Sequence, residues 1–174
     1  MDEADLIRRA RLGEERAAAE LYRAHAPRLF AALRRIAGDD AAAEDWAQEA
    51  WIRVLTSLDR FRGESRFSTW LYRVAFNVAA SLRRSRRWGR GEVELGEETK
   101  TVEADEARVL DRLTLEGALA RLTPSMRSVL VLHDVEGYRH DEIAAMLGIG
   151  ASTSRSQLFK ARARMEALLG ERTE

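Results

Sequence analysis

The segment from Arg66 to Arg84 has a helical pattern with two different faces. One face is an apolar stripe at helical spacing, made of Phe67, Trp70, Leu71, Val74, Val78 and Leu82. The other face carries rings, an amide and guanidinium groups, namely Tyr72, Arg73, Phe76, Asn77, Arg83 and Arg84. Guanidinium groups make planar, bidentate and stacking contacts with phosphates, bases or carboxylates, so this face is a candidate binding surface. The alternatives are that the Tyr72 and Phe76 rings are simply buried in a helical bundle and that genomic base composition explains the arginines.

The segment YRHDEIAAMLGIGASTSRSQLFKARARM, residues 138–165, has the layout of a helix-turn-helix motif. A short helix with Ile143, Ala144 and Leu147 turned inward ends at Gly148, and a second helix opens with a Ser/Thr cluster. In such motifs the second helix presents its N-terminal side chains to base edges in the major groove, and basic residues along it reach phosphates. The candidates for base contacts are Ser152, Thr153, Arg155 and Ser156, and those for backbone contacts are Lys160 and Arg162. The alternative is an antiparallel helix pair with a solvated basic face.

The segment AAAEDWAQEAWIRVL, residues 41–55, predicts a helix with an acidic patch. Its inward side chains are expected to be Trp46, Ala50, Val54 and Leu55. The patch on another side is made of Asp45, Gln48, Glu49 and the apolar Ile52. Such a patch suits a basic partner helix. The alternative is a solvated acidic first turn that interacts favourably with the helix dipole.

The sequence gives no support for an enzyme or a metalloprotein. A di-iron carboxylate site needs paired Glu-x-x-His motifs, and none occurs. The three histidines, His25, His133 and His140, are scattered along the chain. There is also no nucleophile–base pair and no glycine-rich phosphate loop. We therefore expect no catalytic activity, no metal and no cofactor.

Composition indicates a folded protein without covalent staples. The chain has 174 residues, 45% of them hydrophobic, which suits one ordinary domain or two small ones. The lack of cysteine excludes disulfides and thiolate metal sites and suits a reducing cytoplasm. No apolar run approaches a membrane span, and the start MDEADLIRRARLGEE is too charged for a signal peptide, so we expect no membrane insertion. The zero net charge combines +5 in residues 1–90, −6 in residues 91–111 and +1 in residues 112–174.

The candidate binding residues are expected to lie on helices. Ala, Leu, Arg and Glu dominate the first 90 residues, and the alternation of period two that is typical of strands is missing. Helices are predicted near residues 3–12, 14–25, 27–37, 41–57, 67–86, 107–122, 124–135, 140–147 and 152–169. Gly13 separates the first two, and Pro27 should start or kink the third. Asp39 or Asp40 should cap the next helix, and Thr123, followed by Pro124, should cap a later one.

The expected fold class is all-α, with two small helical domains joined by a flexible acidic linker. The stretch GEVELGEETKTVEADEA has many acids, two glycines and no sustained apolar period, which is typical of a linker. The predicted domains are residues 1–90 and 109–174, with the linker at residues 91–108. The second domain contains the helix-turn-helix.

Five segments together resemble the bacterial RNA polymerase sigma factors of the extracytoplasmic-function subfamily. They are ELYRAHAPRLF, AEDWAQEAWIRVL, LDRFRGESRFSTWLYRVAFNVA, LTPSMRSVLVLHDVEGYRHDEIAAMLGI and TSRSQLFKARAR. They occur in the family's order and leave only the linker unmatched. The resemblance implies two helical domains on a flexible tether, which agrees with the organisation predicted from the residues.

The resemblance implies a role for each candidate surface. In the family, the helix corresponding to Arg66–Arg84 and the loop before it hold the promoter −10 element as a single strand, with one base turned into a pocket. Stacking planes, an amide and positive charge suit that task. By position Asn77 corresponds to the pocket residue, with Phe61, Arg62 and Gly63 on the adjacent loop. The acidic patch corresponds to the docking surface for the clamp helices of the polymerase β′ subunit, and the helix-turn-helix to the reader of the −35 duplex.

The implied partners are core RNA polymerase, including the β′ clamp helices and the β flap, promoter DNA and an anti-sigma factor. Three residues depart from the family pattern. Arg139 stands where a serine commonly caps the helix, Ser154 replaces an apolar residue, and Gln157 replaces a basic one. Two rival hypotheses are a helix-turn-helix regulator that acts without polymerase docking and a helical hydrolase or metalloenzyme.

Overall fold

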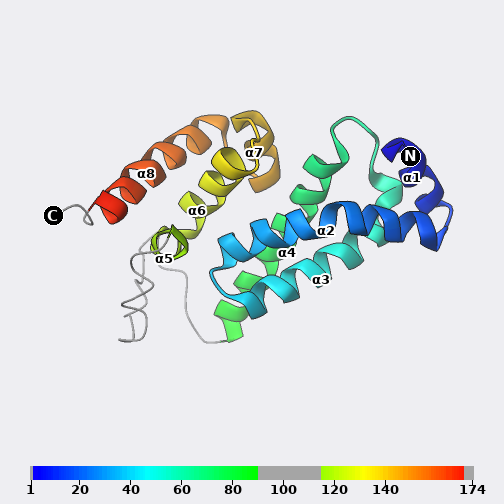
Figure 1. Cartoon of the computed structure of the whole chain (residues 1–174), viewed down its shortest axis with the longest axis horizontal. Helices are drawn as coiled ribbons and strands as arrows, with labels where there is room; N and C mark the ends of the chain where they lie inside the picture. Colours follow the sequence, from blue (N-terminus) through cyan, green and yellow to red (C-terminus); the bar gives the residue numbers. More distant parts are fainter. Residues whose placement is uncertain (1, 90–114, 171–174) are drawn as a thin grey trace.

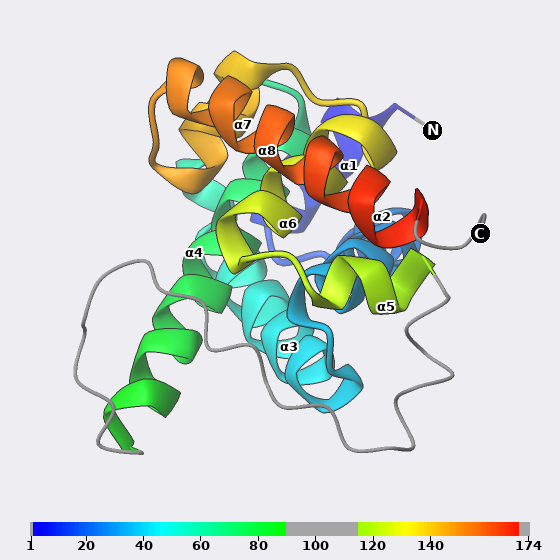
Figure 2. The same cartoon turned by 90° about the vertical axis from the view of Figure 1, so that its left-hand side faces the viewer.

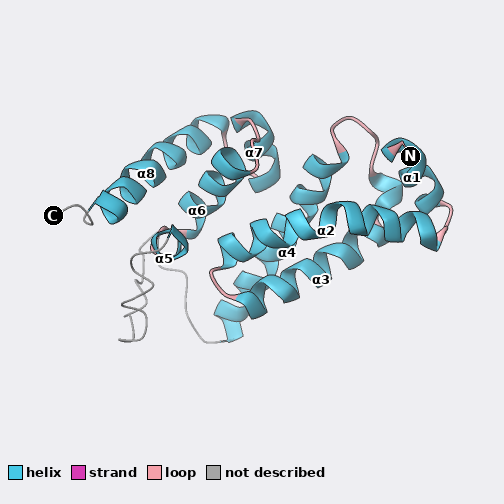
Figure 3. Ribbon diagram, in the orientation of Figure 1, coloured by secondary structure: helices cyan, strands magenta, loops and turns pink. Residues whose placement is uncertain are grey.

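The computed structural model describes residues 2–89 and 115–170 (Figure 1). Its helices are α1 (Glu3–Arg11), α2 (Glu15–Ala37), α3 (Asp40–Thr56), η1 (Leu58–Arg60), α4 (Phe67–Gly89), α5 (Leu115–Ala120), α6 (Pro124–Leu130), η4 (Val131–Val135), α7 (His140–Leu147) and α8 (Ala151–Gly170). Within these ranges every segment is helix, turn or loop, which confirms the all-α prediction (Figure 3). The predicted linker at residues 91–108 lies outside the described residues.

The N-terminal domain is built on three long helices. α3 packs against both α2 and α4, and α1 packs against α2 (Figure 1). The apolar faces of these helices meet in the core, where Leu21, Val54 and Leu71 are fully buried. In the stripe predicted for α4, Phe67, Leu71 and Val78 are buried, whereas Trp70, Val74 and Leu82 are only partly buried. Asp39 caps α3, because its carboxylate accepts from the amides of Ala41 and Ala42, each at 3.3 Å.

A single helix, α2, occupies the region where two helices were predicted. The expected break at Pro27 is wrong, because Glu15–Ala37 is continuous. Proline inside a helix removes one backbone hydrogen bond and costs about 3 kcal/mol. Here the apolar stripe continues on both sides of Pro27, from Leu21 to Leu29 and Leu33, all of them buried. Burial of each such side chain contributes about 1.5–3 kcal/mol, so packing outweighs the proline.

The C-terminal domain consists of α5, α6, α7 and α8. The predicted N-cap of α6 is confirmed, since Thr123 Oγ1 accepts from the Met126 amide at 3.3 Å and Pro124 occupies the first helical position. The single helix predicted for residues 124–135 is only partly correct, because α6 passes into a wider π-helical turn, η4. Val131 and Leu132 of this turn are both fully buried.

The two domains pack against each other around one continuous apolar core. α4 lies beside α7, and α2 contacts α5, α6 and η4 (Figures 1 and 2). Arg127 of α6 is buried in this interface and donates to three carbonyls, those of Ile36, Ala120 and Leu122. Burial, together with the nearby positive charge of Arg83, lowers the pKa of Arg127. Gly38, in the left-handed region with φ of 69°, makes room for this guanidinium, since a Cβ there would stand 2.7 Å from Nη1.

Candidate functional site

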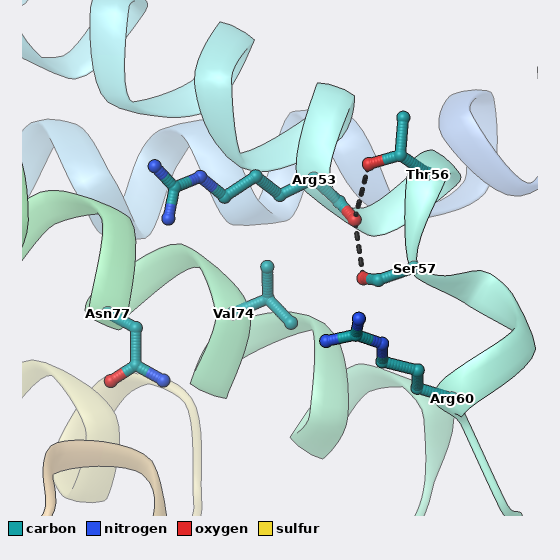
Figure 4. A pocket seen from close by; sticks show the side chains of 6 residues that line it. All are labelled: Arg53, Thr56, Ser57, Arg60, Val74 and Asn77. Carbon is teal, nitrogen blue, oxygen red and sulfur yellow. Dashed lines mark hydrogen bonds between the residues drawn. The ribbon is translucent and has the colours of Figure 1, made fainter.

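An open pocket of about 360 Å³ lies where α4 faces the end of α3 and η1 (Figure 4). Its lining residues are Arg53, Thr56, Ser57, Arg60, Val74 and Asn77. The Thr56 and Ser57 hydroxyls donate to the backbone carbonyl of Arg53, so they already have an acceptor. The exposed amide of Asn77 and the guanidinium groups of Arg53 and Arg60 supply the remaining polar lining. This set can hydrogen-bond a base edge and contact phosphates on either side of it.

The loop before α4 divides into a buried base and an exposed tip. Phe61 is buried against Phe67 and Trp70, with ring centroids 5.6 and 5.5 Å apart, so its ring is not presented to a ligand as the sequence prediction required. Arg62 and Gly63 are exposed at the tip. Gly63 has a φ of 74°, a conformation that favours glycine.

The rings of Tyr72 and Phe76 are not on an exposed face, contrary to the sequence prediction. Tyr72 is 2% exposed and Phe76 5% exposed. The Tyr72 hydroxyl donates to Glu136 Oε2 at 3.0 Å, and its ring packs on Tyr138 with centroids 5.3 Å apart. Burial, followed by the charge of Glu136, raises the pKa of Tyr72. The C-terminal domain therefore covers Tyr72 in this arrangement.

The arginines of α4 differ in their availability. Arg84 is exposed, whereas Arg73 and Arg83 are half-buried. The Arg83 guanidinium lies over the Trp46 ring, 5.1 Å from its centroid, in a cation–π contact. Arg73 Nε is buried without an acceptor among the described residues. Positive charge therefore borders the pocket helix, and among the described arginine side chains of α4 only Arg84 is exposed.

The acidic patch of α3 is exposed, as its helical spacing predicted. Asp45, Gln48 and Ile52 are exposed, and Glu49 pairs with Arg53 along the same helix at 2.8 Å. Ile52 is 51% exposed, and Leu55, which was expected to face inward, is 42% exposed. The exposed apolar surface on this face of α3 is therefore larger than predicted, which is a feature of protein interaction sites.

The second helix of the helix-turn-helix, α8, presents its predicted contact residues to solvent. The exposed residues are Ser152, Thr153, Arg155, Ser156, Lys160 and Arg162. Arg162 forms a two-pronged ion pair with Asp134, at 2.6 and 3.0 Å, so it already has a carboxylate partner. That guanidinium, with a contribution from His133, lowers the pKa of Asp134.

Phe159 is 76% exposed on α8 and was not among the residues predicted from the sequence. It follows Arg155 by four residues and Ser156 by three, so it shares their face of the helix. The signal that could have found it is this spacing from the predicted base-contacting residues. A phenylalanine on such a face can contact a thymine methyl group in the major groove.

Two departures from the family pattern are accommodated locally. The amide of Arg139 donates to Glu142 Oε2 at 2.9 Å, so the start of α7 is capped from within the helix rather than by a serine side chain. Ser154 is fully buried, and a 2.9 Å hydrogen bond joins its hydroxyl to His140 Nδ1. The polar group is therefore satisfied where an apolar one is usual.

Residues 2–89 and 115–170 contain no group of three His, Cys, Asp or Glu side chains that could hold a metal ion. In the same part of the chain, none of the helices is both long enough and apolar enough to cross a membrane.

Comparison with known proteins identifies the family. Sigma-70 region 2 matches residues 21–89, and sigma-70 region 4 matches residues 112–165. The RNA polymerase sigma-H factor of Pseudomonas aeruginosa is 31% identical, over 94% of this chain and 92% of its own. The ECF RNA polymerase sigma factor SigM of Mycobacterium tuberculosis is 30% identical, over 97% of this chain and 85% of its own. The chain therefore belongs to the extracytoplasmic-function group of sigma-70 RNA polymerase sigma factors.

A solved structure shares this fold. The sigma factor RpoE of Bartonella quintana, in complex with the anti-sigma factor NepR, has a TM-score of 0.70 and 22% identity, covering 87% of this chain and 96% of that chain. As a sigma factor, the protein binds core RNA polymerase and directs promoter-specific transcription initiation. The alternative of a regulator that acts without polymerase is not favoured. Sigma factors are generally not enzymes, which also weighs against the hydrolase hypothesis.

Proposed function

We propose that the N-terminal domain holds the unpaired −10 strand of the promoter at the pocket around Asn77. The observation that carries this proposal is that the exposed Asn77 amide shares an open pocket with Arg53 and Arg60. A base turned out of its stack needs a group that reads its edge, and the flanking phosphates need cations. Arg62 and Gly63 on the loop, and Arg73, Arg83 and Arg84 on α4, extend the binding surface along the strand.

The test is the variant Asn77→Ala in transcription complexes with core polymerase. Asn77 is exposed, so its removal deletes a base contact and no core atoms, and loss of such a contact costs about 1–3 kcal/mol. We expect open-complex formation, measured by permanganate reactivity of unpaired thymines, to fall while affinity for core polymerase stays unchanged. Ser81→Ala, also exposed on α4, is the matched control. Normal strand opening by Asn77→Ala would remove the pocket assignment.

The C-terminal domain reads the −35 duplex through α8 in this proposal. Ser152, Thr153, Arg155 and Ser156 contact base edges at the N-terminal end of the helix, and Lys160 contacts the backbone. Phe159 adds an apolar contact on the same face. Arg162 reaches a phosphate only by exchanging its bond to Asp134 for one to DNA.

The α3 patch is proposed to dock on the β′ clamp helices of polymerase. Asp45, Gln48 and Glu49 supply the polar rim, and Ile52 with Leu55 supplies an apolar centre, which is the usual anatomy of an interface. Contacts with the β flap complete the attachment to core polymerase.

The proposed organisation assigns polymerase docking and −10 recognition to residues 1–90, the tether to residues 91–108 and −35 recognition to residues 109–174. An anti-sigma factor is a proposed partner, supported by the RpoE–NepR complex. The protein works in the cytoplasm beside polymerase and supplies no catalytic group, since nucleotidyl transfer belongs to the polymerase.

A further inference from the structure

Arg11, the last residue of α1, ties the N-terminal helix to the loop that precedes α4. Its Nε donates to the carbonyl of Leu58 at 3.0 Å, and its Nη2 donates to the carbonyl of Phe61. These acceptors lie 47 and 50 residues further along the chain, on η1 and on the first residue of the loop. A single guanidinium therefore bridges the short helix and the loop that leaves it.

The hydrogen bonds from Arg11 reinforce the turn at the end of η1. The Leu58 carbonyl already accepts from the Phe61 amide at 3.2 Å, so Arg11 reinforces the turn that η1 closes. Hydrogen bonds from a charged donor are roughly twice as strong as neutral ones, and two bonds from a planar fork also fix a direction. Arg11 thus sets the direction in which the chain leaves η1 and enters the loop.

The remainder of the loop has few anchors of its own. Phe61 and Phe67 are buried at its two ends, whereas Arg62, Gly63 and Glu64 between them are exposed. Gly63 has open space where a Cβ would stand. The position of the loop tip therefore depends on how firmly the base of the loop is held.

We propose that Arg11 is a positioning residue for −10 recognition, acting through the loop at residues 61–66. This inference rests on the proposed role of that loop in binding the −10 strand. Arg11 lies outside the matched sigma-70 region 2, which begins at residue 21. The first helix thereby contributes to promoter opening without touching DNA.

The experiment compares Arg11→Ala with Arg8→Ala in the full-length protein bound to core polymerase. Arg8 is on the same helix and pairs with Asp5, so its removal makes the same change in charge without touching the loop. For Arg11→Ala we expect about a tenfold slower rate of open-complex formation, the equivalent of one lost charged hydrogen bond, with unchanged polymerase affinity. Arg11→Lys should recover part of the rate, since an ammonium reaches one carbonyl at a time. Arg8→Ala should stay within about twofold of the parent protein.

Two further readouts separate positioning from a general loss of stability. Amide hydrogen exchange across residues 61–66 should accelerate in Arg11→Ala and not in Arg8→Ala. The losses caused by Arg11→Ala and Arg62→Ala should be less than additive, because the first acts through the loop that carries the second. Additive losses, or unchanged exchange in the loop, overturn the inference. If Arg62→Ala itself leaves strand opening normal, the proposed function of the loop fails instead.

Discussion

At the scale of single residues, His140 and Ser154 form a polar contact inside the helix-turn-helix, at a position where the family usually has an apolar side chain. Ser154 Oγ is hydrogen-bonded to His140 Nδ1, and the His140 ring stacks on His133 with ring centroids 4.7 Å apart. Burial lowers the pKa of His140, and the nearby charges of His133, Arg155 and Arg162 lower it further, against the opposing charge of Asp134. The folded protein therefore favours the neutral imidazole.

Folding stability is accordingly expected to fall as the pH drops below the ordinary histidine value of about 6.5. The unfolded chain takes up a proton at His140 before the folded chain does, so the contribution of this residue is complete above that pH and is lost below it. In His140→Asn the free energy of unfolding should depend less steeply on pH between about 7 and 5. Urea titrations across that range measure how steeply the free energy of unfolding depends on pH. The matched control is His25→Asn, which also removes one imidazole. An unchanged slope in His140→Asn contradicts the argument.

At the scale of elements, α8 separates packing from recognition on its two faces. Leu158, Ala161 and Met165 are buried against the domain, whereas Phe159 stands out among the exposed polar residues. Phe159→Ala should leave the melting temperature unchanged, because little surface is removed from the core. It should weaken binding of polymerase to the −35 element by about 1–3 kcal/mol at a promoter where a thymine methyl meets the ring.

The matched control for Phe159→Ala is Val135→Ala, another exposed apolar residue of the same domain, at 50% exposure. Binding to a panel of −35 duplexes with single-base substitutions locates the contact. An equal loss on every duplex would assign Phe159 to the DNA backbone or to polymerase rather than to a base.

The exposed acidic patch of α3 leads to a separate prediction about docking on core polymerase. Reversing two charges of the patch, in Asp45→Arg/Glu49→Arg, should reduce affinity for core polymerase without unfolding the domain, because like charges then face a basic partner. Glu44→Arg/Asp59→Arg makes the same change in net charge at exposed positions outside the patch. Affinity is measured by titrating labelled protein with core polymerase at fixed salt. Equal losses in both double variants would indicate a general charge effect.

Elements with a local signal were predictable from the sequence, and those set by tertiary packing were not. The caps at Asp39 and Thr123 are short-range hydrogen bonds, and the structure confirms both. The continuity of α2 through Pro27 depends on burial against α3, which outweighs a local rule. For the candidate site, the exposure of Asn77 and of the α8 residues agrees with the prediction. The burial of Tyr72 does not, because the covering groups come from a distant part of the chain.

At the scale of the whole molecule, Glu136 joins the two domains. Its side chain is 3% exposed and receives bonds from Arg28, at 2.5 Å, and from the Tyr72 hydroxyl, at 3.0 Å. Arg28 and Glu136 are 108 residues apart, so no local pattern could have paired them. Arg127, donating to the carbonyl of Ile36, makes a second buried contact across the same interface. If Tyr72 and Phe76 are to meet an unpaired strand, this interface must open first.

Glu136→Ala is therefore expected to favour separation of the domains. It leaves the buried Tyr72 hydroxyl without its acceptor, at a cost of about 1–3 kcal/mol, whereas Arg28, 66% exposed, regains water at little cost. The chain has no cysteine, so dyes on Arg23→Cys and Glu166→Cys can report the distance between α2 and α8 by energy transfer.

We call the arrangement in which the two domains are packed together closed, and the arrangement in which they are separated open. The fraction of closed molecules should fall in Glu136→Ala. The pKa of Tyr72, which burial and Glu136 raise in the closed arrangement, should move toward its ordinary value. Asp59→Ala, which removes an exposed acid of the N-terminal domain, should change neither measurement. With core polymerase present, the parent protein and Glu136→Ala should show the same long distance between the two dyes. The reason is that binding to the polymerase surface replaces the contact that Glu136 makes between the domains. A parent protein that remains closed on polymerase while it melts promoter DNA would exclude Tyr72 and Phe76 from strand binding.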